Sequence, residues 1–255
     1  MITVSIIGTG NVAWHLAKCL SAKAGIHLKQ IIGRNGDTLA QFSEFAPCTA
    51  DISSQQIVDV LIIAVSDTAI AQIPKQIKDG HQLVVHTSGS MPMNALEPLV
   101  NRGVFYPLQT FSKGFAVDWS NIPLCLEVFQ EEHQVLLLKL ASAIGNEVHF
   151  INSKEREKLH LAAVFVNNFG NHLLAYAEKI CEEGNLDFSL LQPLAEETVK
   201  KAFVLGSENA QTGPAKRGDT ISLKKHLTLL KDKDQINTYK ELTNYILKKY
   251  GRKEL

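Results

Sequence analysis

A stretch near the N-terminus, Thr3-Val-Ser-Ile-Ile-Gly8-Thr-Gly10-Asn-Val-Ala13, decides the fold. It begins like a buried strand, and the turn that follows has the pattern G-x-G-x-x-A and leads into a helical stretch. Gly8 permits the tight turn, Gly10 lets backbone N–H groups approach a pyrophosphate, and Ala13 allows the helix to pack closely on the strand. The stretch therefore predicts the dinucleotide site of a Rossmann domain, although glycine turns also join strands to helices for purely structural reasons.

Short runs rich in valine and isoleucine alternate with helical stretches until about residue 150. This alternation is typical of a doubly wound α/β sheet that is mostly parallel. The run VLIIAV at 60–65 is apolar at consecutive positions, as expected of a central strand that is covered on both faces. Strands are expected at 3–7, 28–33, 58–65, 83–86, 103–106, 124–128 and 147–151.

The strand signals stop after Ile151, and the rest of the chain is predicted to be helical. Asn152, followed three residues later by Glu155, has the pattern of a capping box that opens a long helix. We therefore expect a Rossmann domain at 1–151 and a helical domain for substrate binding and dimerisation at 152–255. Helices are expected at about 153–183, 188–206, 219–231 and 234–250.

The composition argues against several classes of partner. Lys+Arg and Asp+Glu both number 26, so no net charge would draw nucleic acid or an anionic membrane to the whole molecule. The four cysteines show no C-x-x-C spacing, so neither a metal site nor a disulfide framework is predicted. The N-terminus lacks a basic leader, and no apolar run approaches the ~18 residues of a membrane span. We expect a soluble, cytoplasmic protein with a small-molecule substrate and no nucleic acid or membrane partner.

The second predicted strand ends in Ile31-Ile-Gly-Arg34-Asn35, which indicates the kind of dinucleotide. An NAD-specific domain usually carries an Asp or Glu at this strand end, where it accepts a hydrogen bond from the ribose 2′-hydroxyl. No carboxylate stands there in this chain, and the guanidinium of Arg34 matches the geometry of a 2′-phosphate. The sequence therefore favours NADP (NADPH) over NAD, with an exposed surface arginine as the alternative.

Polar residues also follow the expected strands at 58–65, 83–86 and 103–106. Ligands of open α/β sheets bind outside the carboxyl ends of the strands, so we expect these residues to lie around the same ligand site. Small hydroxyls and glycines there leave room for a ribose and a nicotinamide, although Ser66, Ser88 and Ser90 are also good helix N-caps. The expected cofactor-binding residues are Gly8, Thr9, Gly10, Asn11, Val12, Arg34, Asn35, Val65, Ser66, Asp67, Thr87, Ser88 and Gly89, and Ser90 and Gln109 are expected on the substrate side.

The helical stretch at 159–177 is apolar almost all round, which is typical of a helix buried in a domain or in a subunit interface. At 100° per residue, Asn167 and Asn171 fall within about 20° of His160, and Asn168 lies about 80° away. Buried amides and imidazoles need hydrogen-bond partners, so this polar stripe must meet protein, water or a ligand. We expect His160, Asn167 and Asn168 to be catalytic. Asn171 is expected to contact the substrate, and a structural histidine is the alternative for His160.

A later loop, Thr212-Gly-Pro-Ala-Lys-Arg-Gly-Asp219, carries two adjacent cations. Pro214 suits a first helical turn and Asp219 suits an N-cap, so the loop has a structural role in any case. Lys216 and Arg217 could in addition bind an anionic group of the substrate or a cofactor phosphate. The alternative is that both cations are merely solvated.

The combination of the glycine turn, Tyr106-Pro-Leu-Gln-Thr-Phe111, His160 with Asn168, and the loop 212–219 resembles a family of uncharacterised bacterial proteins. They are described as NADP oxidoreductases and have a Rossmann-like N-terminus and a helical domain of unknown function, and the likeness covers essentially the whole chain. More distantly, the layout is similar to pyrroline-5-carboxylate reductases, 3-hydroxyisobutyrate dehydrogenases and deazaflavin-dependent NADP oxidoreductases. The resemblance implies NADP(H), a second domain like that of 6-phosphogluconate dehydrogenase-like proteins, and a homodimer formed through it.

Two departures limit what the resemblance implies for the mechanism. Hydroxyisobutyrate-type enzymes place a catalytic lysine about one turn before an asparagine, where this chain has Ala163 and Val164. The resemblance also leads us to expect a histidine where this chain has Tyr106. His160 therefore becomes the expected proton donor or acceptor.

The leading hypothesis is an NADP-dependent oxidoreductase that transfers hydride to or from a carbonyl or imine of a small, anionic metabolite. Because the lysine is absent, a second hypothesis is a protein that binds NADP(H) without turnover, as a sensor or an assembly subunit. A hydrolase acting through Ser88 is disfavoured, since no G-x-S-x-G pattern surrounds that serine.

Overall fold

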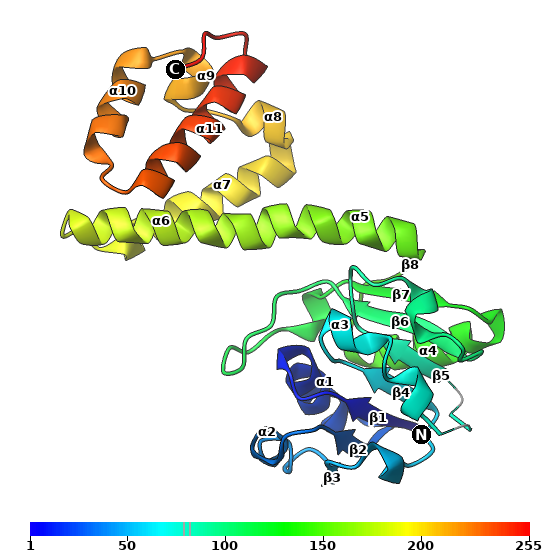
Figure 1. The fold of residues 1–255 in the computed structure, drawn as a ribbon. Helices are drawn as coiled ribbons and strands as arrows, with labels where there is room; N and C mark the ends of the chain where they lie inside the picture. The colour runs from blue at the N-terminus through cyan, green and yellow to red at the C-terminus, as the bar shows by residue number, and fades with distance from the viewer. Residues whose placement is uncertain (79, 82) are drawn as a thin grey trace. The chain divides into compact units, whose positions relative to one another are not determined.

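The computed structural model describes residues 1–78, 80–81 and 83–255, which divide into two compact units, Met1–Asn167 and Asn168–Leu255. The described residues of the first unit contain an eight-stranded sheet with helices, and those of the second unit are helical (Figure 1). The predicted fold class, an α/β Rossmann sheet followed by an all-α part, is confirmed.

The sheet has the doubly wound topology that the sequence predicts. Its strands are β1 (Ile2–Ile7), β2 (Ile26–Ile32), β3 (Cys48–Thr49), β4 (Val60–Ile63), β5 (Leu83–His86), β6 (Arg102–Pro107), β7 (Leu124–Val128) and β8 (Val148–Phe150). They lie in the order β3-β2-β1-β4-β5-β6-β7-β8, and every pair of neighbours is parallel except β6 and β7. The order reverses between β1 and β4, which is where open sheets of this kind bind ligands. The edge strand β3 was not predicted, because two residues carry no periodicity.

Helices cover both faces of this sheet. Ile6 and Ile62 belong to a core that includes buried residues of α1 and α4, whereas Ile7 and Ile63 belong to a second core that includes α3. Successive strand residues point to opposite faces, so the consecutive apolar run of β4 serves both cores. The α-helices of the first unit are α1 (Asn11–Ser21), α2 (Gly36–Ala40), α3 (Asp67–Ile70), α4 (Gln134–Ile144) and α5 (Ser153–Ala163).

The helix expected at 153–183 is divided in the structure. It consists of α5, a π-helical segment at Val164–Phe169, and α6 (Gly170–Glu183). The predicted capping box is present, because the Asn152 side chain accepts from the backbone N–H of Glu155 and the Glu155 side chain accepts from that of Asn152. A π-helical turn inside an α-helix is rare and is frequently found at functional sites.

The two compact units part after Asn167, not after residue 151. The reason is that α5 packs on the first unit, where Arg156 is 1% exposed and Leu159 contacts the apolar cluster around Tyr106. Contacts define these two units. Whether residues 1–151 and 152–255 fold independently, as the predicted domain boundary implies, stays a prediction.

The second unit has a small core of its own, built around Ala215, Leu223 and Leu247. Its further helices are α7 (Gln192–Leu205), α8 (Ser207–Ala210), α9 (Pro214–Arg217), α10 (Thr220–Leu229) and α11 (Lys233–Lys249). Among the described residues of the whole chain, no helix is both long enough and apolar enough to cross a membrane.

The apolar helix around 159–177 is not buried within the chain. Leu161 is 59% exposed, Val166 is 72% exposed and Leu174 is 45% exposed. The interpretation of this stretch as a helix in the middle of a domain is therefore wrong. The other interpretation, a subunit interface, stays a prediction.

Candidate functional site

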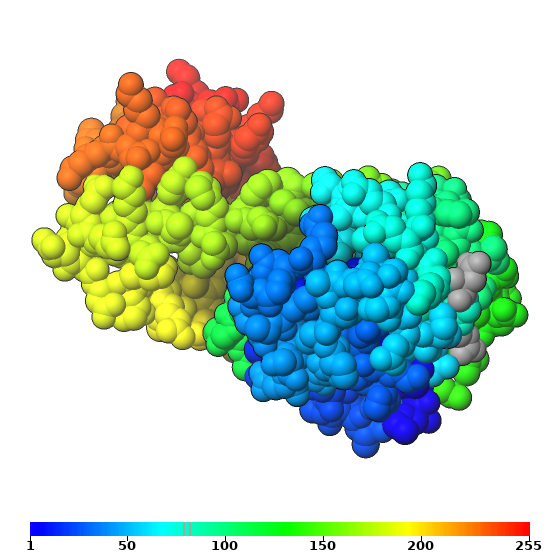
Figure 2. All heavy atoms as spheres, turned by 60° about the horizontal axis from the view of Figure 1, so that its bottom comes forward, coloured from blue at the N-terminus to red at the C-terminus, as the bar shows by residue number. Residues whose placement is uncertain are grey.

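A cavity of about 850 Å³ lies in the first unit at the carboxyl ends of β1, β2, β4 and β5. This is within the usual size of small-molecule and cofactor pockets. Most of its lining comes from segments coloured blue and cyan, which lie side by side in the space-filling view (Figure 2). Of the residues that the sequence singled out, the lining contains Gly8, Thr9, Gly10, Asn11, Val12, Arg34, Val65, Ser66, Thr87, Gln109 and Asn167.

The glycine turn has the geometry that an anion cradle requires. A Cβ on Gly8, whose φ is +132°, would lie 2.0 Å from the Ala64 carbonyl oxygen, so Gly8 allows the turn to pack on β4. A Cβ on Gly10 would meet no atom within 4 Å, so the space beside this residue is open. Gly10 is also the N-cap of α1 and offers no side chain to the first N–H groups of that helix. Those N–H groups and the positive end of the helix dipole fit a pyrophosphate.

At the exit of β2, two neighbouring residues have different roles. Arg34 is exposed and lines the cavity, and it forms no ion pair in the part of the chain that the structure describes. Asn35 is not part of the lining, because its side chain caps α2 by accepting from the backbone N–H groups of Asp37 and Thr38 at 2.9 and 3.2 Å. The Asn35 side chain thus already has a structural partner, and its predicted contact with the cofactor would require it to leave the N-cap of α2.

The lining also contains residues that are not among the expected site residues. They include Asp51, Ile52, Gln72, Gln76, Thr110 and Phe111. Asp51 follows β3, and both of its carboxylate oxygens accept hydrogen bonds from Ser53 at 2.8 Å, which lower the pKa of the carboxyl group. Only Thr110 and Phe111 lie in a motif that the sequence analysis quoted, and no pattern in the sequence distinguishes the others.

Several predicted residues beyond β4 and β5 bond to one another instead of lining the cavity. The Ser88 hydroxyl accepts from the backbone N–H groups of Ser90 and Met91 at 3.2 and 3.0 Å. The Ser90 hydroxyl donates to Asp67 at 2.5 Å. These contacts support the alternative that the serines here stabilise the turn. Ser66 does line the cavity, and its side chain makes no capping bond to α3.

Tyr106 and His160 form a pair at the end of β6. The Tyr106 hydroxyl lies 3.1 Å from His160 Nδ1, and the two rings meet edge to face with centroids 6.0 Å apart. A Cβ on Gly89 would lie 2.6 Å from His160 Nδ1 and 2.7 Å from Tyr106 Cζ, so only glycine permits this approach. Burial is the main cause that raises the pKa of Tyr106 to about 12, and the phenol therefore keeps its proton at neutral pH. The sequence analysis had treated Tyr106 only as a missing histidine.

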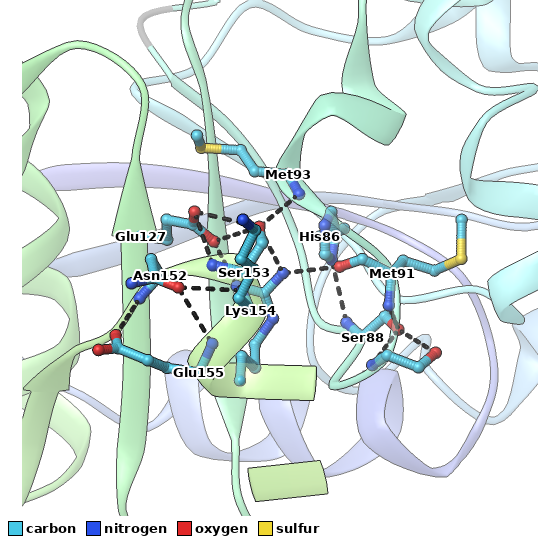
Figure 3. Close-up of polar contacts among 11 residues, drawn as sticks. His86, Ser88, Met91, Met93, Glu127, Asn152, Ser153, Lys154 and Glu155 are labelled. Carbon is cyan, nitrogen blue, oxygen red and sulfur yellow. Dashed lines mark hydrogen bonds and ion pairs between the residues drawn. The ribbon is translucent and has the colours of Figure 1, made fainter. Parts of the chain in front are cut away.

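A buried polar network holds the first turn of α5 against the sheet (Figure 3). Arg156 forms an ion pair with Glu127 of β7 and donates to the Met91 carbonyl oxygen at 2.6 Å. Ser153 donates to Glu127 from its backbone N–H at 3.0 Å and from its hydroxyl at 2.8 Å. His160 follows Arg156 by four residues and therefore lies on the same face of α5 as the anchored Arg156.

His86, at the end of β5, is fully buried beside this network. Its Nδ1 atom accepts from the backbone N–H of Ser88 at 3.2 Å (Figure 3). Burial first and the positive charge of Arg156 second lower the pKa of His86 to about 4. The imidazole is therefore neutral at pH 7 and acts as an acceptor in the turn.

The expected angles between His160 and the asparagines at 167, 168 and 171 do not apply to the helix in the structure. A wheel of 100° per residue assumes an unbroken α-helix, and the π-helical segment after Ala163 changes the phase of every later residue. Asn167 lines the cavity of the first unit. Asn168 and Asn171 belong to the second unit and are exposed.

The two cations of the loop 212–219 lie in the second unit. Lys216 is half-buried, donates to the Gln211 carbonyl oxygen at 2.7 Å and lies 5.0 Å from the centroid of the Tyr250 ring. Arg217 is exposed in the last turn of α9. Lys216 thus already has a structural role inside its own unit, as the loop was expected to have.

Comparison with known proteins relates the whole chain to proteins of similar fold. The domain of unknown function DUF2520 matches residues 122–246. A "putative NADP oxidoreductase" from Bacteroides fragilis is 36% identical with a TM-score of 0.90, and the match covers 97% of this chain and 98% of that chain. No curated protein matches the sequence.

More distant structures show the fold alone. A protein from Thermotoga maritima is 22% identical with a TM-score of 0.70, over 98% of this chain and 100% of that chain. A pyrroline-5-carboxylate reductase from Coxiella burnetii is 15% identical with a TM-score of 0.56, over 98% and 97% of the two chains. The Bacteroides fragilis protein has a higher sequence identity than these structures, and its match also covers nearly the full length of both chains. The chain belongs to the family of that protein, in which a Rossmann-like domain precedes a helical domain of unknown function.

Proposed function

We propose that this chain is an NADP-dependent oxidoreductase that acts on a carbonyl or imine of a small metabolite. The observation that carries the proposal is the cavity at the glycine turn, which combines open space beside Gly10 with the guanidinium of Arg34, which has no ion-pair partner among the described residues. The family resemblance and the name of the Bacteroides fragilis protein, an NADP oxidoreductase, support the same function. A nicotinamide bound there would supply or accept the hydride.

The chain's own residues would bind and orient the cofactor. The first N–H groups of α1 would receive the pyrophosphate beside Gly10, and Arg34 would pair with the 2′-phosphate. The remaining part of the cavity is lined by residues that follow β5, β6 and α5, namely Thr87, Gln109 and Asn167. Gln109 and Asn167 both carry amides, but the Gln109 oxygen already accepts from the Thr110 N–H at 2.8 Å, so Asn167 is the amide that would hold a carbonyl oxygen or an imine nitrogen.

His160 would hold or move the proton that accompanies reduction or oxidation. The Tyr106 phenol carries a single proton, and His160 Nδ1 at 3.1 Å is in reach to accept it as a hydrogen bond. A neutral imidazole that accepts at Nδ1 carries its own proton on Nε2. In that tautomer, Nε2 is the atom of His160 that would donate toward a substrate bound beside the cavity, which His160 itself does not line. The roles of Asn168 and Asn171, and an anionic substrate recognised by Lys216 and Arg217, stay predictions from the sequence.

The cofactor proposal is tested by titrating the purified protein with NADPH and NADH while following nicotinamide fluorescence. We expect NADPH to bind more tightly, and Arg34→Ala to weaken NADPH roughly 10- to 100-fold, as the loss of a charge-assisted pair worth about 1.5–3 kcal/mol implies. NADH affinity should change little, because NADH lacks the 2′-phosphate. If the wild-type protein bound neither nucleotide, the oxidoreductase proposal would be wrong.

A second candidate function is NADP(H) binding without turnover. It is favoured by Ala163 and Val164 at the positions of the expected lysine and by the high pKa of the Tyr106 phenol, which makes it a weak acid. Saturable NADPH binding without NADPH consumption across a panel of keto acids, imines and deazaflavins would favour this function over catalysis.

A cytoplasmic homodimer completes the proposal. Large apolar side chains of the second unit are exposed, among them Phe203 at 82%, Val204 at 73% and Ile221 at 82%. Monomeric proteins rarely leave large contiguous apolar patches in water, so a second copy is expected to cover part of this surface. Sedimentation at micromolar concentration should give twice the mass of one chain, and a monomer would contradict the proposal.

A further inference from the structure

The segment 109–113, which follows β6, is held beside the glycine turn by hydrogen bonds from side chains of α1. The Asn11 side chain donates from Nδ2 to the Phe111 carbonyl oxygen at 2.8 Å, and His15 Nε2 lies 3.0 Å from the Ser112 carbonyl oxygen. The Phe111 ring is buried and lies 5.1 Å from the His15 ring, centroid to centroid. The backbone leading into Lys113 therefore has a set position relative to α1.

Lys113 places its ammonium group beside the middle of the glycine turn. Its Nζ atom lies 3.3 Å from the Thr9 carbonyl oxygen, 2.9 Å from Gln41 Oε1 and 5.3 Å from the centroid of the Phe42 ring. All three neighbours are uncharged. In residues 1–78, 80–81 and 83–255, Lys113 has no carboxylate partner, so its positive charge is uncompensated.

Thr9 connects this ammonium group to the exit of β2. A Cβ on Gly33 would lie 2.4 Å from Thr9 Cγ2, and the Thr38 hydroxyl donates to Thr9 Oγ1 at 3.1 Å. Arg34 follows Gly33 directly and lines the same cavity as Thr9. Among the described residues, neither Lys113 nor Arg34 has an ion-pair partner. Lys113 bonds to Thr9 without lining the cavity itself, and Arg34 lines the cavity to which Thr9 belongs.

A ligand with about two negative charges would be attracted to both cations. A phosphate monoester carries about −1.5 to −2 at neutral pH, more than one guanidinium can neutralise. We propose that Lys113 is a specificity-determining residue that pairs, together with Arg34, with the 2′-phosphate of NADP(H). The assignment rests on the proposed binding of NADP(H) in this cavity.

The experiment compares NADPH and NADH affinities of the wild type, Lys113→Met and Lys113→Arg by nicotinamide fluorescence. Lys18→Met is the matched control, because Lys18 is also an exposed lysine over an aromatic ring, 5.0 Å from the centroid of Trp14, whereas only Lys113 of the two bonds to the Thr9 carbonyl oxygen in the described residues. We expect Lys113→Met to weaken NADPH about 10-fold, NADH less than about twofold, and Lys113→Arg to retain most of the preference. Raising the salt concentration should shrink the difference.

Each result has a definite meaning. An equal loss of both nucleotides in Lys113→Met would overturn the assignment and leave Lys113 as a structural residue that fixes the segment 109–113. Unchanged NADPH affinity would overturn it as well. A wild type that binds neither nucleotide would overturn the proposed function itself, whereas a wild type that binds both equally would overturn only the 2′-phosphate contact. Matching thermal unfolding of all variants separates these results from misfolding.

Discussion

At the residue scale, the hydrogen bond between the Tyr106 phenol and His160 Nδ1 bears on which nitrogen of His160 carries the proton. His160 Nδ1 lies 3.1 Å from a phenol that burial keeps protonated. We expect the phenol to donate to Nδ1, which would favour the His160 tautomer that is protonated on Nε2. The bare Cα of Gly89 makes room for the pair, since a Cβ there would lie within 2.7 Å of both rings. Tyr106 is therefore a positioning residue for His160.

Replacing Tyr106 with phenylalanine should release this constraint while keeping the packed ring. We expect both neutral tautomers of His160 to become populated, because a lost hydrogen bond of about 1 kcal/mol changes their ratio roughly fivefold. The ¹⁵N shifts of the two ring nitrogens at alkaline pH measure the ratio. The matched control is Tyr239→Phe, which removes an analogous bond of 2.7 Å to His226 Nδ1 in the second unit and should leave His160 unchanged. An identical His160 spectrum in Tyr106→Phe would contradict the positioning role.

At the element scale, the sequence predicts best what is local. The stretch from β1 through the glycine turn to α1 is present as expected, because each step depends on residues within a few positions of one another. The capping box at Asn152 is of the same kind. The contact of Tyr106 with His160 joins residues 54 positions apart, and Lys113 meets Thr9 across 104 positions, so no spacing rule could have indicated either.

The helix beginning at Ser153 illustrates the limit of periodicity. Its apolar character was recognised, but a wheel cannot tell a helix buried in its own domain from one whose faces are exposed in a single chain. Nor can it place the π-helical segment at Val164–Phe169, which shifts the phase of the residues beyond it. The position of α5 is set instead by Arg156, whose buried ion pair with Glu127 depends on tertiary packing.

At the scale of the whole molecule, His86 links the stability of the first unit to pH. In the folded chain burial lowers the pKa of His86 to about 4, whereas in the unfolded chain it returns to the ordinary value of about 6.5. Above pH 6.5 both states are neutral, and His86 has no effect on the pH dependence. As the pH falls from about 6.5 to about 4, only the unfolded state binds the proton, so the free energy of unfolding decreases, by up to about 3 kcal/mol in total.

Urea unfolding at pH 7.5, 5.5 and 4.5 measures this dependence. Both tryptophans, Trp14 and Trp119, lie in the first unit, so their fluorescence reports on that unit alone. His86→Asn removes the titrating group while its amide oxygen can still accept the Ser88 N–H, so its free energy of unfolding should fall less steeply than that of the wild type over the same range. His81, whose pKa burial also lowers, and the carboxylates remain in both proteins and therefore cancel in the difference. Parallel pH profiles would mean that solvent reaches His86 in the folded state and that its buried imidazole is not held neutral.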